Sequence, residues 1–106
     1  STTWAGNTQL GWSSGTNVHK DSGGGTIVVD SGADGLWVKH TGFDFAAGTP
    51  HLGTTANTSL VTLTGGTDVI CKLKAGEAIF LPQPKNQTIT LSDDGDSAAV
   101  EYTVLS

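Results

Sequence analysis

Three histidines, His19, His40 and His51, have the side chains with the widest chemical range in this chain. Imidazole nitrogens bind zinc and transfer protons near neutral pH. Zinc ligands on one element are usually separated by only a few residues, whereas these histidines are far apart and no cysteine pair accompanies them. We therefore predict no metal site from one copy of the chain. The alternative is a symmetric oligomer, which would bring one histidine of each copy together on its axis.

The carboxylates show two patterns that deserve a test. The run Asp93-Asp94-Gly95-Asp96 resembles part of a calcium loop, but it lacks the alternating ligand spacing and the distal glutamate. We expect a solvated acidic turn, with weak calcium binding as the alternative. Glu77 and Glu101 are candidates for a glycosidase pair, but both occupy polar positions of expected strands and are predicted to face solvent.

Nucleophile motifs are missing. No Gly-x-Ser-x-Gly elbow occurs, and Gly23-Gly24-Gly25 is not followed by the residues of a phosphate-binding loop. Cys71 is the single cysteine, and its alternation with Val69 and Leu73 predicts that it faces inward as a small apolar residue. We predict no catalytic residues, no metal and no cofactor, and we do not expect an enzyme.

Composition restricts the partners. The chain of 106 residues is long enough for one domain, with a net charge of −5 and lysine but no arginine. This balance argues against nucleic acid and against an anionic membrane surface, and no apolar run approaches the roughly 18 residues of a membrane span. The opening Ser-Thr-Thr, with no signal peptide, favours synthesis in the cytoplasm, so the sequons at Asn57 and Asn86 are expected to be unused. The alternative is a processed secreted product, for which this expectation reverses.

Alternation with a period of two residues predicts strands, and no window shows a helical period. Short strands separated by turn residues indicate an all-β fold, an antiparallel two-sheet sandwich of jelly-roll or immunoglobulin-like type. The segments that we expect to be strands are Thr26–Asp30, Leu36–Thr41, Ser59–Thr64, Asp68–Leu73, Glu77–Pro82, Gln87–Ser92 and Ala98–Leu105.

The strands carry expectations about orientation. Leu36, Val38 and His40 should face the core, which places Trp37 on the outer face or under a loop. Residues 77–82 are nearly all apolar, which favours a central strand covered on both faces. Residues 42–58 lack strand character and are predicted to be a long connection, in which Phe43 and Phe45 plug one end of the sandwich.

Residues 1–24 are polar and aperiodic, which indicates an N-terminal arm before a sandwich domain of residues 25–106. The arm nevertheless carries Trp4, Leu10 and Trp12. It either folds back on its own sandwich or lies across a neighbouring subunit, where tryptophan is a common anchor. The predicted partner-binding residues are Trp4, Leu10, Trp12, Trp37, Phe43 and Phe45.

Three segments carry a resemblance: Leu-Trp-Val-Lys-His-Thr-Gly at 36–42, Leu-Lys-Ala-Gly-Glu-Ala-Ile-Phe-Leu-Pro at 73–82 and Ala-Val-Glu-Tyr-Thr-Val-Leu at 99–105. Residues 26–106 are similar to small β-sandwich virion proteins of tailed bacteriophages. The resemblance implies a capsid decoration, or cement, protein, made in the host cytoplasm and located in the virion. Its implied partners are the major capsid protein or other virion subunits and further copies of itself, as a trimer or another closed oligomer on a symmetry axis. The family offers no catalytic residues to transfer.

Two other functions remain open at this point. A small tail or fibre component is not distinguished from a decoration protein by these segments. A carbohydrate-binding sandwich module is the competing class, with Trp37 and Trp12 as platforms for sugar rings.

Overall fold

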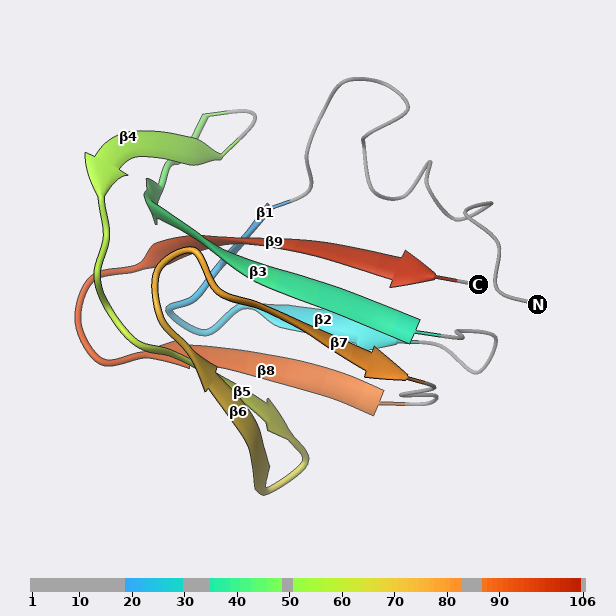
Figure 1. Ribbon diagram of the computed structural model, residues 1–106. Helices are drawn as coiled ribbons and strands as arrows, with labels where there is room; N and C mark the ends of the chain where they lie inside the picture. Colours follow the sequence, from blue (N-terminus) through green and yellow to red (C-terminus); the bar gives the residue numbers. More distant parts are fainter. Residues whose placement is uncertain (1–18, 30–34, 49–50, 83–86, 106) are drawn as a thin grey trace.

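The computed structural model describes residues 19–29, 35–48, 51–82 and 87–105 (Figure 1), and all regular structure in these ranges is β. The strands are β1 (His19–Asp21), β2 (Thr26–Val29), β3 (Gly35–Phe45), β4 (Leu52–Ala56), β5 (Val61–Gly65), β6 (Asp68–Leu73), β7 (Ala78–Pro82), β8 (Gln87–Asp93) and β9 (Ala98–Leu105). The predicted all-β sandwich is confirmed.

The strands form two antiparallel sheets. The five-stranded sheet has the order β1-β9-β3-β4. β7 also pairs with β3, on the edge opposite β9: it pairs with the first part of β3, and β4 pairs with the end of β3 on the same edge. The four-stranded sheet has the order β2-β8-β5-β6. In Figure 1, β9 and β3 run side by side above β2 and β8, and β4 projects at one end.

The connectivity distinguishes between the two predicted sandwich types. Without β4, the orders β1-β9-β3-β7 and β2-β8-β5-β6 pair early strands with late ones in both sheets. Two four-stranded sheets interleaved in this way form a jelly roll. β4 is an addition that forms a hairpin with the far end of β3.

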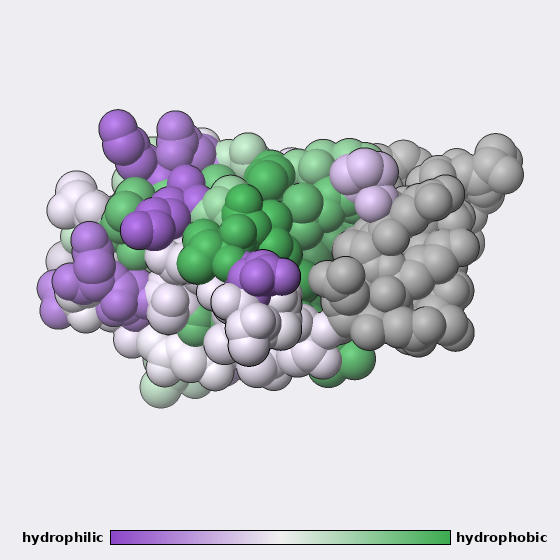
Figure 2. All heavy atoms as spheres, turned by 90° about the horizontal axis from the view of Figure 1, so that it is seen from below, coloured by the Kyte–Doolittle hydropathy of each residue, from purple (hydrophilic) through white to green (hydrophobic). Residues whose placement is uncertain are grey.

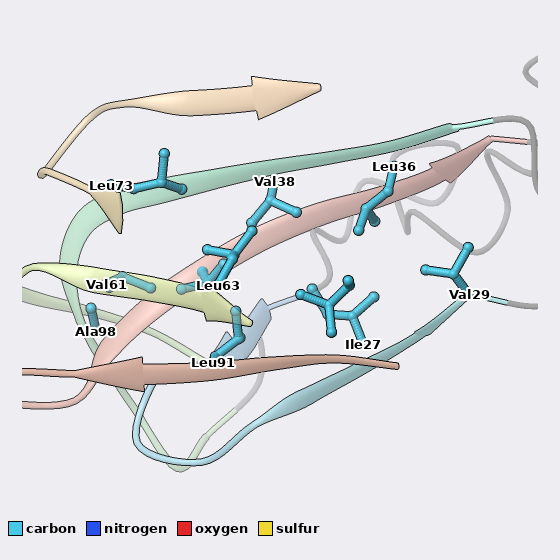
Figure 3. Packing of buried hydrophobic residues seen from close by; sticks show 11 residues of the cluster. Ile27, Val29, Leu36, Val38, Val61, Leu63, Leu73, Leu91 and Ala98 are labelled. Atoms are coloured by element: carbon cyan, nitrogen blue, oxygen red, sulfur yellow. The ribbon is translucent and has the colours of Figure 1, made fainter. Parts of the chain in front are cut away.

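The core lies between the sheets, where alternate side chains of both inner faces meet. Figure 3 shows Leu36 and Val38 of β3 facing Ile27 of β2 and Leu63 of β5. Each of these side chains is at most 1% exposed, and burial of such a side chain stabilises the fold by about 1.5–3 kcal/mol. The expected inward orientation of Leu36, Val38 and His40 is confirmed.

The expected long connection over residues 42–58 is wrong, because it contains the end of β3 and all of β4. The register between β3 and β9 shifts between His40 and Asp44, and Gly42 adopts a φ of +85° in this irregular stretch. A bulge of this kind interrupts the alternation of side chains on which strand prediction depends. β4 is largely exposed and therefore has no apolar face to reveal it.

A second bulge corrects the expected position of Val69. Thr64 pairs with Val69 and Leu63 with Cys71, so Ile70 is the extra residue in β6. Because an extra residue reverses the alternation, Val69 is 60% exposed, whereas Leu73 is buried and Cys71 is partly buried against the core.

The predicted central position of residues 77–82 is also wrong. β7 pairs only with β3 among the described strands, and Ala78, Phe80 and Pro82 are exposed. Its apolar outer residues gave the segment the composition of a strand buried on both faces.

The predicted boundary of the arm is too late. β1 lies within residues 1–24, yet it pairs with β9 and belongs to the five-stranded sheet. The sandwich therefore includes His19–Asp21, and residues 1–18 lie outside the described residues.

Candidate functional site

Asn57 is the centre of a buried polar network at the end of the sandwich where β4 leads into β5. Its Nδ2 donates to Asp44 Oδ1 (2.8 Å) and to the Asp96 carbonyl oxygen (3.0 Å), while its Oδ1 accepts from the Ser59 N–H (2.9 Å). The side chain is 3% exposed. Asn57 therefore fastens three separate segments to one another, which is a structural use of an amide.

His40 extends the network from β3. The Gly42 N–H donates to His40 Nδ1 (3.0 Å), so Nδ1 is an acceptor and Nε2 carries the hydrogen that is donated to the Ser59 carbonyl oxygen (2.8 Å). The ring is fully buried. Both nitrogens are occupied by internal bonds, so His40 is not available as a metal ligand or a general base in this arrangement.

Ser22 and the acidic turn complete the network. Ser22 Oγ donates to Asp93 Oδ2 (2.9 Å) and accepts from the Ala98 N–H (2.7 Å). Asp94 Oδ1 accepts from the Leu60 N–H (2.7 Å), so two of the carboxylates of the acidic turn bind protein groups. Across the ranges that the structure describes, no three His, Cys, Asp or Glu side chains gather to hold a metal ion.

The same contacts bear on the sequon at Asn57. Attachment of a glycan would require access to Nδ2, which is buried and donates two hydrogen bonds. The folded chain therefore cannot accept a glycan there unless Asn57 leaves these bonds. Asn86 lies outside the described residues.

The residues predicted to bind a partner are placed in two regions. Trp37 lies on the outer face of the five-stranded sheet, as expected, where it is partly buried. Phe43 and Phe45 lie at the end of β3 that pairs with β4. Trp4, Leu10 and Trp12 lie outside the described residues.

Phe43 and Phe45 belong to the projecting β3–β4 hairpin and do not plug the sandwich. Phe43 is 41% exposed, and the Phe45 ring stacks on His51 with a centroid distance of 5.2 Å. His51 adopts a φ of +70°, which is unusual for a residue with a Cβ, and its Nδ1 lies 2.9 Å from the Ala46 carbonyl oxygen. Stacking and hydrogen bonding hold this conformation and fix the hairpin that presents Phe43.

Sequence reasoning missed Phe80 as a surface residue. Phe80 is directly opposite Trp37 in the register of β7 with β3, and it is 49% exposed. Both side chains lie on the outer face, where cross-strand neighbours are in contact range. The signal was the proline at position 82, because proline is confined to edge strands and strand ends.

Glu77 and Glu101 do not form the pair considered for glycoside cleavage. Glu77 Oε1 accepts from the Lys74 N–H (2.7 Å) and closes the turn between β6 and β7.

Glu101 lies on the outer side of β9, but the prediction that it faces solvent is wrong, because it is only 8% exposed. Its Oε2 atom is buried and has no hydrogen-bond partner within the described ranges, and Lys39 is its cross-strand neighbour. Neighbouring outer residues of β9 are buried as well, which alternation alone did not indicate.

Cys71 is expected to be a poor nucleophile at neutral pH. Burial raises the pKa of its thiol, and the negative charge of Glu77 raises this pKa further. Alkylation by iodoacetamide at pH 7 should therefore be slower in the folded protein than in the urea-unfolded chain. The Glu77→Gln variant keeps an acceptor for the Lys74 N–H. It should increase the alkylation rate and lower the pH at which this rate reaches half of its maximum. Asp68→Asn, which removes a charge elsewhere on β6, should leave the alkylation rate unchanged. Equal rates in the unaltered chain and in both variants would contradict this prediction.

The described residues thus combine a rigid polar frame with aromatic side chains on the outside, and they offer no helix able to cross a membrane. Comparisons with protein-family models, with curated proteins and with solved structures gave no match.

Proposed function

We propose that this chain is a virion structural protein, most specifically a capsid decoration protein that binds the outer surface of a capsid. The observation that carries the proposal is the contrast between polar and aromatic side chains. The polar groups of Ser22, His40 and Asn57 form hydrogen bonds within the chain, while Phe43 and Phe80 are exposed to solvent. Such a molecule is built for contact, not for a reaction.

The physical demands on a decoration protein support this function. It must stay folded on the outside of a particle, which a frame of buried hydrogen bonds favours. It binds in many copies, so modest contacts per subunit add up over the array. The jelly roll occurs in both viral and carbohydrate-binding proteins, so the fold alone does not select between these functions.

The test is reconstitution on particles. Capsids are prepared from the virus that encodes the chain after deletion of its gene, and the purified chain is added back. We expect saturable co-sedimentation at a fixed number of copies per capsid and a higher temperature of capsid disruption. The Phe43→Ser variant should bind more weakly, whereas Thr54→Ser, at an exposed position of β4, should bind normally. Failure of the unaltered chain to bind would refute the proposal.

The Trp37–Phe80 pair favours one other function, the recognition of a carbohydrate. Two aromatic rings opposite each other on an outer sheet face form a platform on which a sugar ring can stack. A glycan array followed by titration of tryptophan fluorescence separates the two functions. Saturable, sugar-specific quenching that is lost in Phe80→Ala would favour carbohydrate recognition over decoration.

A further inference from the structure

The outer edge of β7 presents backbone groups that no described strand uses. His40 N–H donates to the Glu77 carbonyl oxygen (2.9 Å), which fixes the phase of the ladder between β3 and β7. In an antiparallel ladder the bonded residues alternate, so Ile79 and Leu81 turn their peptide groups toward β3. The N–H and C=O groups of Ala78 and Phe80 therefore point away from the sheet.

The side chains around this edge are apolar. On β7, Ala78, Phe80 and Pro82 are exposed, and Ile79 and Leu81 are only partly buried. β6, the edge strand of the other sheet that precedes β7 in the chain, also has apolar side chains at its surface: Val69 is 60% exposed, and Ile70 and Cys71 are partly buried. Figure 2 views the molecule from the side toward which the β5–β6 hairpin points, and hydrophobic residues gather in the middle of that face. We call these residues of β6 and β7 the apolar edge.

Two of the other described edges, β6 and β1, carry features that discourage pairing, whereas β2, like β7, is uncharged but pairs over only four residues. β6 is interrupted by the bulge at Ile70 and carries Lys72, while β1 has only three residues and carries Lys20. β7 is regular over all five residues that pair with β3, and it has no charged side chain. Natural proteins cover such an edge or pair it with another strand.

We propose that β7 pairs antiparallel with β7 of a second copy of the chain, about a two-fold axis next to Ile79. Ala78 of each copy then lies opposite Phe80 of the other. Each of these two pairs exchanges both N–H···O bonds, so the interface contains four backbone hydrogen bonds and satisfies every N–H that β7 turns outward. Pro82 has no N–H to lose, and it lies outside the paired residues.

Two properties make a second copy a better occupant than another protein. The chain carries a net charge of −5, yet the apolar edge has no charge between Val69 and Cys71 or between Ala78 and Pro82, so identical copies can approach there without direct repulsion. In this register the large Phe80 side chain lies beside the small Ala78 of its partner, which avoids a steric clash across the axis. A two-fold contact of this kind is closed and yields dimers, not fibres. The inference holds whether or not the chain decorates a capsid.

Sedimentation equilibrium over a range of concentrations tests the dimer. The unaltered chain should be a reversible dimer that tightens as salt is added, because salt screens the repulsion between two acidic copies. Ala78→Pro removes an outward N–H that β3 does not use, and Phe80→Lys places a charge beside the two-fold axis; each should raise the dissociation constant at least tenfold. Val28→Lys is the matched control, since Val28 is 70% exposed on the edge strand β2, and it should dimerise normally.

Hydrogen exchange locates the contact. In the dimer the amides of Ala78 and Phe80 should exchange slowly, and they should lose this protection on dilution, while those of Ile79 and Leu81 are protected at all concentrations by β3. A chain that stays monomeric, forms a trimer or aggregates without limit would overturn the proposal. So would a dimer that is unaffected by Ala78→Pro and Phe80→Lys.

Discussion

Replacing Asn57 with alanine is expected to lower the free energy of unfolding by about 4 kcal/mol. The substitution leaves Asp44 Oδ1, the Asp96 carbonyl oxygen and the Ser59 N–H without their partner on the partly buried side that faces the buried Asn57 side chain. Each buried group that loses its hydrogen bond costs about 1–3 kcal/mol. Since the free energy of unfolding of small domains is about 5–15 kcal/mol, this one change should remove a large part of the stability. Urea unfolding followed by circular dichroism measures the loss.

The Asn57→Asp variant separates hydrogen bonding from shape. Aspartate still accepts from the Ser59 N–H, but it places an oxygen where Nδ2 donated to the Asp44 carboxylate. Two facing carboxylates repel, so we expect a loss at least as large as that of Asn57→Ala at neutral pH. Stability should recover partly as the pH falls, because a proton shared between the two groups restores a donor. Thr58→Ala, at the exposed neighbouring position, should change stability by less than about 0.5 kcal/mol. Similar losses at positions 57 and 58 would contradict the network.

His40→Phe is expected to cost about 2–4 kcal/mol. Phenylalanine fills a similar volume, but it leaves the Gly42 N–H and the Ser59 carbonyl oxygen without the ring nitrogens that bind them. Because the ring is fully buried, water cannot replace either bond. The urea midpoint should fall, and the Gly42 amide should exchange faster with solvent.

The same substitution at His51 is the control. His51→Phe keeps an aromatic ring to stack on Phe45 and removes one side-chain contact in a partly exposed hairpin. We expect a loss of less than about 1 kcal/mol. If His40→Phe were as mild as His51→Phe, His40 would not be the structural element that its contacts indicate.

Alternation predicted the fold wherever a strand was regular and buried on one face. Residues 68–73 and 98–105 were predicted with the bounds that β6 and β9 have in the structure. Leu36, Val38 and His40 were placed on the correct face, because period-two burial is a local property that one strand displays by itself.

The failures have physical causes of two kinds. Bulges at Gly42 and Ile70 reverse the alternation, so they hid the end of β3 and misplaced Val69. The position of a strand within a sheet depends on which other strands pair with it, and the residues of that strand alone do not determine this. For this reason alternation did not show that Glu101 on β9 is buried, and Pro82 was the one sign in the segment that β7 is an edge strand.

The candidate site was less predictable than the fold. Trp37 was placed on the outer face from its neighbours alone, whereas Phe80 became visible as its partner only through the register of β7 with β3. The polar network was not predicted, because Ser22, Asn57 and Asp93 are distant in sequence and their residue types are also those of ordinary turns.

The pairing of β1 with β9 has a consequence for the time the chain needs to fold. His19 pairs with Glu101, so the five-stranded sheet cannot close until segments from opposite ends of the described chain have met. The entropy of closing so large a loop is lost before its contacts form, and sandwiches of this kind fold on the order of milliseconds to seconds. During that interval β7 is an unsatisfied strand in an incomplete sheet, so refolding yield should fall as protein concentration rises.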